Sequence, residues 1–278
     1  MDIYMENIKL WDNGSTPYYN EEYGQPETYV TPHIVPAEKD ENDNVKKTGC
    51  VIVCAGGGYE FRADHEGDPV AEFFNQYGIS TFNLAYRFAP YNYYAIRADI
   101  NRAVRWVRYH AEEYNIDPEK IAVLGFSAGG HLACMGATQY DAGLEDGDEI
   151  DRVSCRPDAA VLCYPVVTLF DDYTHRGSRC NLLDGIEEPL RGELVEKLSG
   201  QNAVTSDTPP VFLYHNADDD GVPPENSLNM AAALSKNKIP FELHIFPNGG
   251  HGGGLYKSLE GTRQWPHLAA NWLKRLGY

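Results

Sequence analysis

The sequence predicts an α/β fold with a mostly parallel, doubly wound sheet and helices on both faces. Apolar runs of strand length alternate along the chain with longer stretches that carry apolar residues three and four positions apart. Such alternation is typical of parallel strands joined by crossover helices. The chain has 278 residues, of which 42% are hydrophobic, which suits one domain built on one large sheet. We therefore expect residues 1–278 to form a single domain.

The individual elements follow from these patterns. Short runs rich in β-branched and other apolar residues predict strands at 50–55, 81–86, 121–124, 159–164, 211–215 and 241–246. Between them, helical spacing predicts helices at 69–76, 94–114, 128–138, 225–236 and 263–276.

Two segments stand outside this alternation. Residues 1–47 are rich in Tyr, Asn, Pro and Glu, with short extended candidates at 28–31 and 33–35, and we interpret them as an N-terminal edge segment with a hairpin. Residues 167–209 have no clear strand and separate two strands that should be neighbours. This insertion is either a lid or cap over the site or a surface excursion without a catalytic role.

Charge and cysteine content narrow the classes of function. The formal net charge of -18 repels phosphate backbones and anionic lipids, so we expect neither nucleic acid nor a membrane as partner. No signal peptide or membrane-spanning run is visible. The six cysteines have no tight paired spacing, which favours reduced thiols, a cytoplasmic location and no metal site.

The strongest chemical signal is the G-x-S-x-G string of residues 125–129, placed between a predicted strand and a predicted helix. A serine on such a sharp turn exposes its Oγ above the sheet, so we predict that Ser127 is a nucleophile. The N–H of Ala128, at the positive end of the helix, is positioned to bind an oxyanion. The alternative is a chance glycine-serine turn that caps a helix.

A second signal is the run Gly56, Gly57, Gly58 that follows the strand at 50–55. Glycines allow backbone N–H groups to approach a ligand closely, and we assign oxyanion donors to Gly57 and Gly58. A phosphate-binding loop is the rival interpretation, but the run lacks the Gly-Lys-Ser/Thr ending and the dinucleotide pattern.

The base and the acid come later in the chain. His251 lies on a glycine-lined loop after the last predicted strand, where it can activate the serine. His131 is the alternative base, but it lies one helical turn after the serine and should point away from Oγ, so we interpret it as a residue that packs in the core or supports the site from behind. Three consecutive aspartates follow the strand at 211–215; one should orient the imidazole, and the D-x-x-V-P register selects Asp219. An acidic solvated turn or a cation site is the alternative for this cluster.

Together these motifs resemble the acetyl-xylan-esterase-like branch of the α/β-hydrolase esterases over about residues 48–275. The resemblance rests on five strings in the expected order: residues 56–59, 86–90, 125–131, 219–223 and 246–252. One departure is Ala55, where related esterases often carry His or Pro before the glycines. It implies an α/β-hydrolase fold, deacetylation of plant polysaccharides and their oligomers, and the acid role for Asp219.

The predicted reaction is hydrolysis of small acyl esters, acetyl esters in particular, through an acyl-enzyme on Ser127. It requires no cofactor and no metal, and the expected substrate is a small-molecule or oligosaccharide ester. Tyr59, Arg62 and Tyr173 are our candidates for substrate contact, the tyrosines because aromatic faces stack on sugar rings. A general carboxylesterase or feruloyl esterase is the nearest alternative. A serine peptidase of the prolyl-oligopeptidase type usually adds a propeller domain, for which no segment here is long enough.

Overall fold

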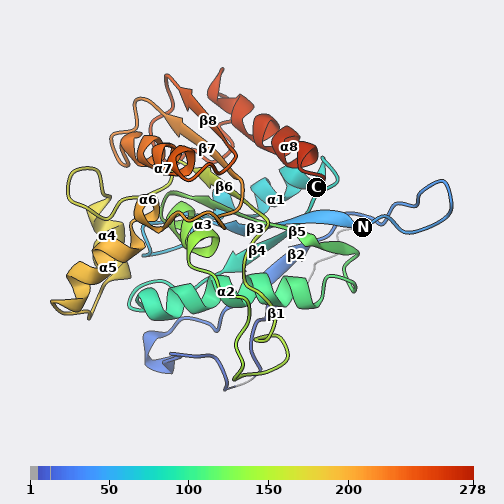
Figure 1. Cartoon of the computed structure of the whole chain (residues 1–278), viewed down its shortest axis with the longest axis horizontal. Coiled ribbons are helices and arrows are strands. Elements are labelled where there is room, and N and C mark those ends of the chain that lie inside the picture. The colour runs from blue at the N-terminus through green and yellow to red at the C-terminus, as the bar shows by residue number, and fades with distance from the viewer. Residues whose placement is uncertain (1–5, 13) are drawn as a thin grey trace.

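The computed structural model describes residues 6–12 and 14–278 and contains one sheet of eight strands (Figure 1). The strand order is β1-β2-β4-β3-β5-β6-β7-β8, and strands β3 to β8 run parallel to one another. Strand β2 is antiparallel to both of its neighbours, β4 and β1. Helices cover both faces, so the predicted α/β-hydrolase fold class is confirmed. The strands are β1 (Ile8–Lys9), β2 (Tyr29–His33), β3 (Thr48–Cys54), β4 (Ser80–Ala85), β5 (Ile116–Phe126), β6 (Ala159–Cys163), β7 (Val211–Asn216) and β8 (Phe241–Phe246).

The central strands are buried on both faces. In β3, Cys50, Ile52 and Cys54 face one hydrophobic cluster, and Val51 and Val53 face the other. This explains why the predicted strands are continuous apolar runs, since a sheet covered by helices on both sides leaves no solvent-facing row.

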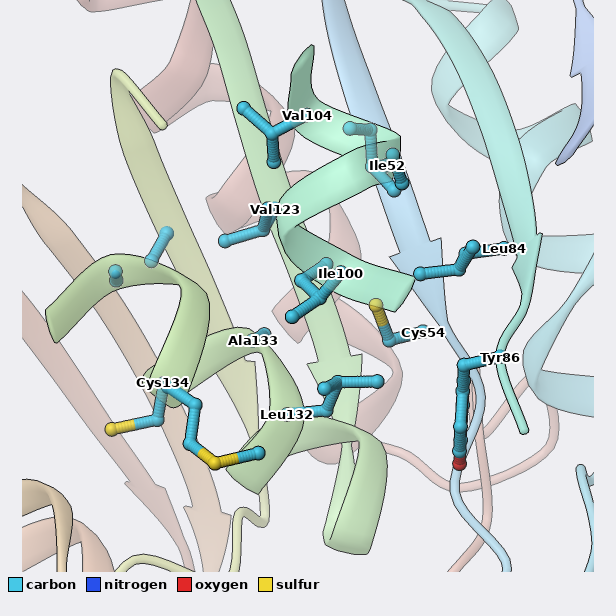
Figure 2. Packing of buried hydrophobic residues seen from close by; sticks show 14 of the residues in the cluster. Ile52, Cys54, Leu84, Tyr86, Ile100, Val104, Val123, Leu132, Ala133 and Cys134 are labelled. Carbon is cyan, nitrogen blue, oxygen red and sulfur yellow. The ribbon is translucent and has the colours of Figure 1, made fainter. Parts of the chain in front are cut away.

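Three helices, α2 (Tyr93–Tyr109), α3 (Ser127–Thr138) and α7 (Glu225–Lys236), pack on one face, and α1 (Asp68–Asn75) and α8 (Trp265–Arg275) on the other. Figure 2 shows Ile100 of α2 and Leu132 of α3 on the same side of the sheet as Val123, in one hydrophobic cluster. Each such fully buried side chain contributes roughly 1.5–3 kcal/mol to the stability of the fold. Short 3₁₀ turns occupy Glu21–Tyr23, Asp64–Glu66 and Thr262–Gln264.

The N-terminal segment lies at the edge of the sheet, but the predicted hairpin of the extended candidates at 28–31 and 33–35 is wrong. Residues 29–33 form the single strand β2, which pairs with β4 along its length and with β1 at Tyr29 and Val30. Pro32 lies inside β2 although proline lacks an N–H donor. In the described part of the chain β1 does not pair with Pro32, so the missing donor interrupts no bond on that side of the strand.

The segment 167–209, described throughout, contains no strand and forms three helices: α4 (Arg176–Leu182), α5 (Leu190–Leu198) and α6 (Gly200–Ala203). Figure 1 shows α4 and α5 together at one end of the molecule. Leu182, Leu194 and Leu198 belong to the same hydrophobic cluster as α2 and α3. The segment is therefore packed into the body of the protein and is not a loose excursion.

Candidate active site

The predicted site residues gather at the carboxyl edge of the sheet. Gly57 and Gly58 follow β3, Ser127 follows β5, Asp219 follows β7 and His251 follows β8. Parallel neighbouring strands end at the same edge, which is where open α/β sheets bind ligands.

Ser127 sits on the sharp turn between β5 and α3 with φ of 53°. The flanking glycines are required by close backbone approach. A Cβ on Gly125 would lie 2.0 Å from the Gly129 carbonyl oxygen, and a Cβ on Gly129 would lie 2.2 Å from the Cys54 carbonyl oxygen. No side chain fits at either position, so the glycine spacing is what permits the turn.

His251 joins Ser127 to Asp219. Its Nε2 lies 2.8 Å from Ser127 Oγ, and its Nδ1 lies 2.7 Å from Asp219 Oδ2. Of the three aspartates, Asp218 accepts instead from the N–H groups of the histidine loop at Gly249 and Gly250. The structure therefore brings together the three residues that the sequence motifs selected.

The Asp219 carboxylate is buried and well supplied with donors. Its Oδ1 accepts from the N–H groups of Gly221 and Val222 at 3.0 and 2.8 Å, and His215 Nε2 lies 3.3 Å from Oδ2. Burial alone would raise the pKa of this carboxyl, but the hydrogen bonds from His215, His251 and Val222 outweigh it and the pKa is lowered. Asp219 is therefore negatively charged at neutral pH.

The glycine loop after β3 offers unused backbone donors. Within the described chain the N–H groups of Gly57 and Gly58 make no hydrogen bond, and that of Ala128 lies in the first turn of α3, where helices leave N–H groups unpaired. The N–H of Gly56 is different, because it donates to Glu66 at 2.6 Å. The loop is held from α4 by Asn181, whose Nδ2 donates to the Gly58 carbonyl at 2.9 Å.

Ser127 and His251 open into a cavity of about 320 Å³. Gly57, Gly58 and Phe61 line it from the oxyanion loop, and His175 lines it from the segment 167–209. A space of this volume is at the small end of ligand pockets.

Our candidates for substrate contact are not in the wall of this cavity. The prediction is wrong for Tyr59, whose side chain is fully buried with its hydroxyl 2.9 Å from His131 Nδ1. Arg62 lines another cavity, of about 600 Å³, and donates to the Tyr86 carbonyl at 2.5 Å. Tyr173 is exposed, and its carbonyl accepts from Asn226. The sequence could not reveal the orientations of these three side chains because they depend on which distant segments pack around each one.

His175 is not identified from the sequence as a residue of the cavity wall, because no sequence motif distinguishes this histidine within the polar insertion. Its Nδ1 accepts from the Ser178 N–H at 3.2 Å, so the proton of the neutral ring is on Nε2. Burial, together with the nearby His251, lowers the pKa of His175, which makes the neutral ring the main form at neutral pH. In the described chain His175 Nε2 has no hydrogen-bond partner, so its N–H remains available.

Glu66 and Tyr164 were also missed, and both are buried beside the site. His131, which we interpret as a residue of the core or one that supports the site, bridges the Tyr59 hydroxyl and the Leu198 carbonyl, and burial lowers its pKa to about 4. The six cysteines are free thiols, five of them buried and Cys180 exposed.

The described residues include neither a metal-binding cluster nor a membrane-spanning helix. No group of three or more His, Cys, Asp or Glu side chains is arranged to hold a metal ion among residues 6–12 and 14–278. In the same part of the chain, no helix combines the length and hydropathy needed to cross a membrane.

Comparison with known proteins places the chain in a family. The sequence pattern of the BD-FAE family matches residues 39–234, more than half of the chain. The chain belongs to the BD-FAE family. Among solved structures, this BD-FAE protein is similar to the acetyl ester-xyloside bifunctional hydrolase from Caldicellulosiruptor lactoaceticus, with 44% identity, a TM-score of 0.90 and coverage of 98% of this chain and 96% of the other.

Curated relatives of this BD-FAE protein include larger enzymes. Endo-1,4-beta-xylanase B of Butyrivibrio fibrisolvens is 40% identical over 76% of this chain, and acetylxylan esterase of Xylanibacter ruminicola is 29% identical over 81%. The matched region spans only 33% and 45% of those two proteins. The resemblance to acetyl-xylan-esterase-like hydrolases that the motifs indicated is thereby confirmed.

Proposed function

We propose that this protein is a serine esterase that hydrolyses small acyl esters, acetyl esters in particular, on xylan-derived or similar plant oligosaccharides. The observation that carries the proposal is the imidazole of His251. One of its nitrogens contacts Ser127 Oγ and the other contacts Asp219, in a cavity open to a ligand. A serine is a feeble nucleophile until such a base accepts its proton.

In the proposed reaction Ser127 Oγ attacks the ester carbonyl while His251 Nε2 takes the hydroxyl proton. Asp219 stabilises the imidazolium, and the N–H groups of Gly57, Gly58 and Ala128 bind the oxyanion. His251 then protonates the departing alcohol, which leaves an acyl group on Ser127. Water, deprotonated by the same histidine, releases the acid and restores the serine; no cofactor or metal enters these steps.

Two observations support the choice of substrate. The cavity of about 320 Å³ suits a small acyl group. The similar proteins include one named an acetyl ester-xyloside hydrolase and one named an acetylxylan esterase. We also propose that the chain acts as one domain in the cytoplasm, where free thiols persist.

We assign the segment 167–209 the role of a fixed cap. Through His175 it forms part of the cavity wall next to Gly58 of the oxyanion loop, and Asn181 ties it to Gly58. The available Nε2–H of His175 would donate to a hydroxyl or ester oxygen of the alcohol part of the substrate.

The test is acetate release from acetylated xylo-oligosaccharides beside hydrolysis of p-nitrophenyl esters of increasing acyl length, with Ser127→Ala as control. Acetate release that disappears in Ser127→Ala supports the proposal. Preference for long or aromatic acyl groups would favour a general carboxylesterase or feruloyl esterase. Full activity of Ser127→Ala would refute the serine mechanism.

A further inference from the structure

Glu66 is a buried carboxyl group that the mechanism above does not use. Its side chain is 2% exposed and lies in the 3₁₀ turn Asp64–Glu66, in the wall of the same cavity as Ser127. The nearest cation-forming group in the described chain is His65, whose Nε2 is 3.9 Å away. Burying a carboxyl group without a close ion pair lowers the stability of the fold unless hydrogen bonds offset the cost, so the hydrogen bonds of Glu66 matter.

The two carboxyl oxygens contact different loops. Oε2 accepts the Gly56 N–H at 2.6 Å, and Oε1 is hydrogen-bonded to the Tyr164 hydroxyl. The Tyr164 oxygen in turn accepts the Gly254 N–H at 2.9 Å. One chain of hydrogen bonds therefore runs from the glycine loop after β3 to the histidine loop after β8.

Both ends of this series of hydrogen bonds lie next to reacting groups. A Cβ on Gly56 would lie 2.7 Å from Glu66 Oε2 and 3.1 Å from Ser127 Cβ, so the Gly56 backbone is held between these two side chains. The Tyr164 ring packs edge-on against His251 with 4.9 Å between ring centroids. A shift of Glu66 would therefore displace the loop that carries Gly57 and Gly58.

We propose that Glu66 is a positioning residue that holds the oxyanion loop in register with Ser127 by accepting the hydrogen bond of the Gly56 N–H. Glu66 is in turn anchored to the histidine loop through Tyr164. The proposal rests on the proposed function of Ser127 and of the Gly57 and Gly58 donors. Burial raises the pKa of Glu66, against the hydrogen bonds from Tyr164 and Gly56. An acceptor at Oε2 is present in either protonation state, so the link to Gly56 does not depend on ionisation.

The experiment compares Glu66→Leu, which removes the acceptor, with Glu66→Gln, which keeps an oxygen for Gly56. Rates are expressed per reactive serine, counted with a fluorophosphonate probe, so that misfolded protein does not contribute. We expect Glu66→Leu to lower kcat about 10²-fold with little change in KM, because displaced oxyanion donors act on the transition state. Glu66→Gln should stay within about tenfold of the wild type. A kcat for Glu66→Leu within threefold of the wild type, or a loss confined to KM, overturns the proposal.

Tyr164→Phe keeps the test decisive should Glu66→Leu fail to fold. It removes the anchor of Glu66 while preserving the ring against His251, and we expect kcat to fall about tenfold. Unchanged kcat in this variant also overturns the proposal. The matched control is Glu72→Gln on the exposed side of α1, which should leave kcat unchanged.

Failure of the substrate assignment would look different. The rate at which the fluorophosphonate labels Ser127 depends on the serine, the histidine and the oxyanion donors and requires no particular ester. If the wild type is labelled rapidly but releases no acetate from xylo-oligosaccharides, the substrate proposal fails, and slower labelling of Glu66→Leu than of Glu66→Gln still supports the role of Glu66. Equal labelling rates in these two variants would exclude it.

Discussion

Replacement of Asp219 by asparagine should abolish most of the activity without unfolding the protein. The two oxygens of the carboxylate have different partners. Oδ1 accepts hydrogen bonds from the N–H groups of Gly221 and Val222, and Oδ2 lies 2.7 Å from His251 Nδ1. An asparagine must keep its single oxygen toward the two backbone donors. Its NH₂ group then faces the imidazole, where a donor meets a donor.

His251 can satisfy that contact only by moving its proton from Nδ1 to Nε2. The Nε2–H would then point at Ser127 Oγ, 2.8 Å away, and could not accept the serine proton. In a serine hydrolase with this geometry the wrong tautomer lowers kcat about 10⁴-fold, which corresponds to roughly 5.5 kcal/mol of lost transition-state stabilisation.

The assay is kcat for p-nitrophenyl acetate, with the urea midpoint measured in parallel to establish folding. The matched control is Asp220→Asn, because Asp220 is exposed and its side chain makes no hydrogen bond in the described chain. Its kcat should stay within about twofold of the wild type. An Asp219→Asn enzyme that keeps more than a tenth of wild-type kcat, or an equal loss in Asp220→Asn, would refute the reasoning.

Three further outcomes follow from the structure. Gly125→Ala should destabilise the fold by about 3 kcal/mol, since its Cβ would lie 2.0 Å from the Gly129 carbonyl oxygen; a urea unfolding curve like the wild type's would contradict that contact. The unfolding free energy should fall by roughly 2 kcal/mol between about pH 8 and pH 5 through His131 alone, because its pKa is lowered to about 4 from the ordinary 6.5 and the unfolded chain takes up the proton first. His131→Asn should lack this part of the pH dependence, and an identical fall in both proteins would exclude it. His175→Ala should raise KM for acetylated xylo-oligosaccharides about tenfold with little effect on p-nitrophenyl acetate, whereas an equal effect on both esters would contradict a contact to the sugar.

Much of the architecture could be predicted because it is encoded locally. The parallel strands of the sheet were anticipated to within a few residues, except that β5 begins at Ile116, five residues earlier than expected. Apolar runs buried on both faces and helical spacing are properties of short windows. The positions of Ser127 and His251 follow from the glycines next to those strands. At Ser127, close backbone approach leaves no room for a side chain on Gly125 or Gly129, whereas at His251 the positive φ of Gly250 and Gly252 favours glycine.

The sequence by itself thus determined the sheet, its covering helices and the order in which Ser127, Asp219 and His251 reach one edge. Only the tertiary structure decided the direction of Tyr59 into the core, the place of His175 in the cavity wall and the burial of Glu66 between two loops. The reason is physical: periodicity and turn chemistry act between near neighbours in the chain. Burial and hydrogen bonding of a single polar side chain depend on which distant segments meet around it, as Gly56 and Tyr164 meet around Glu66.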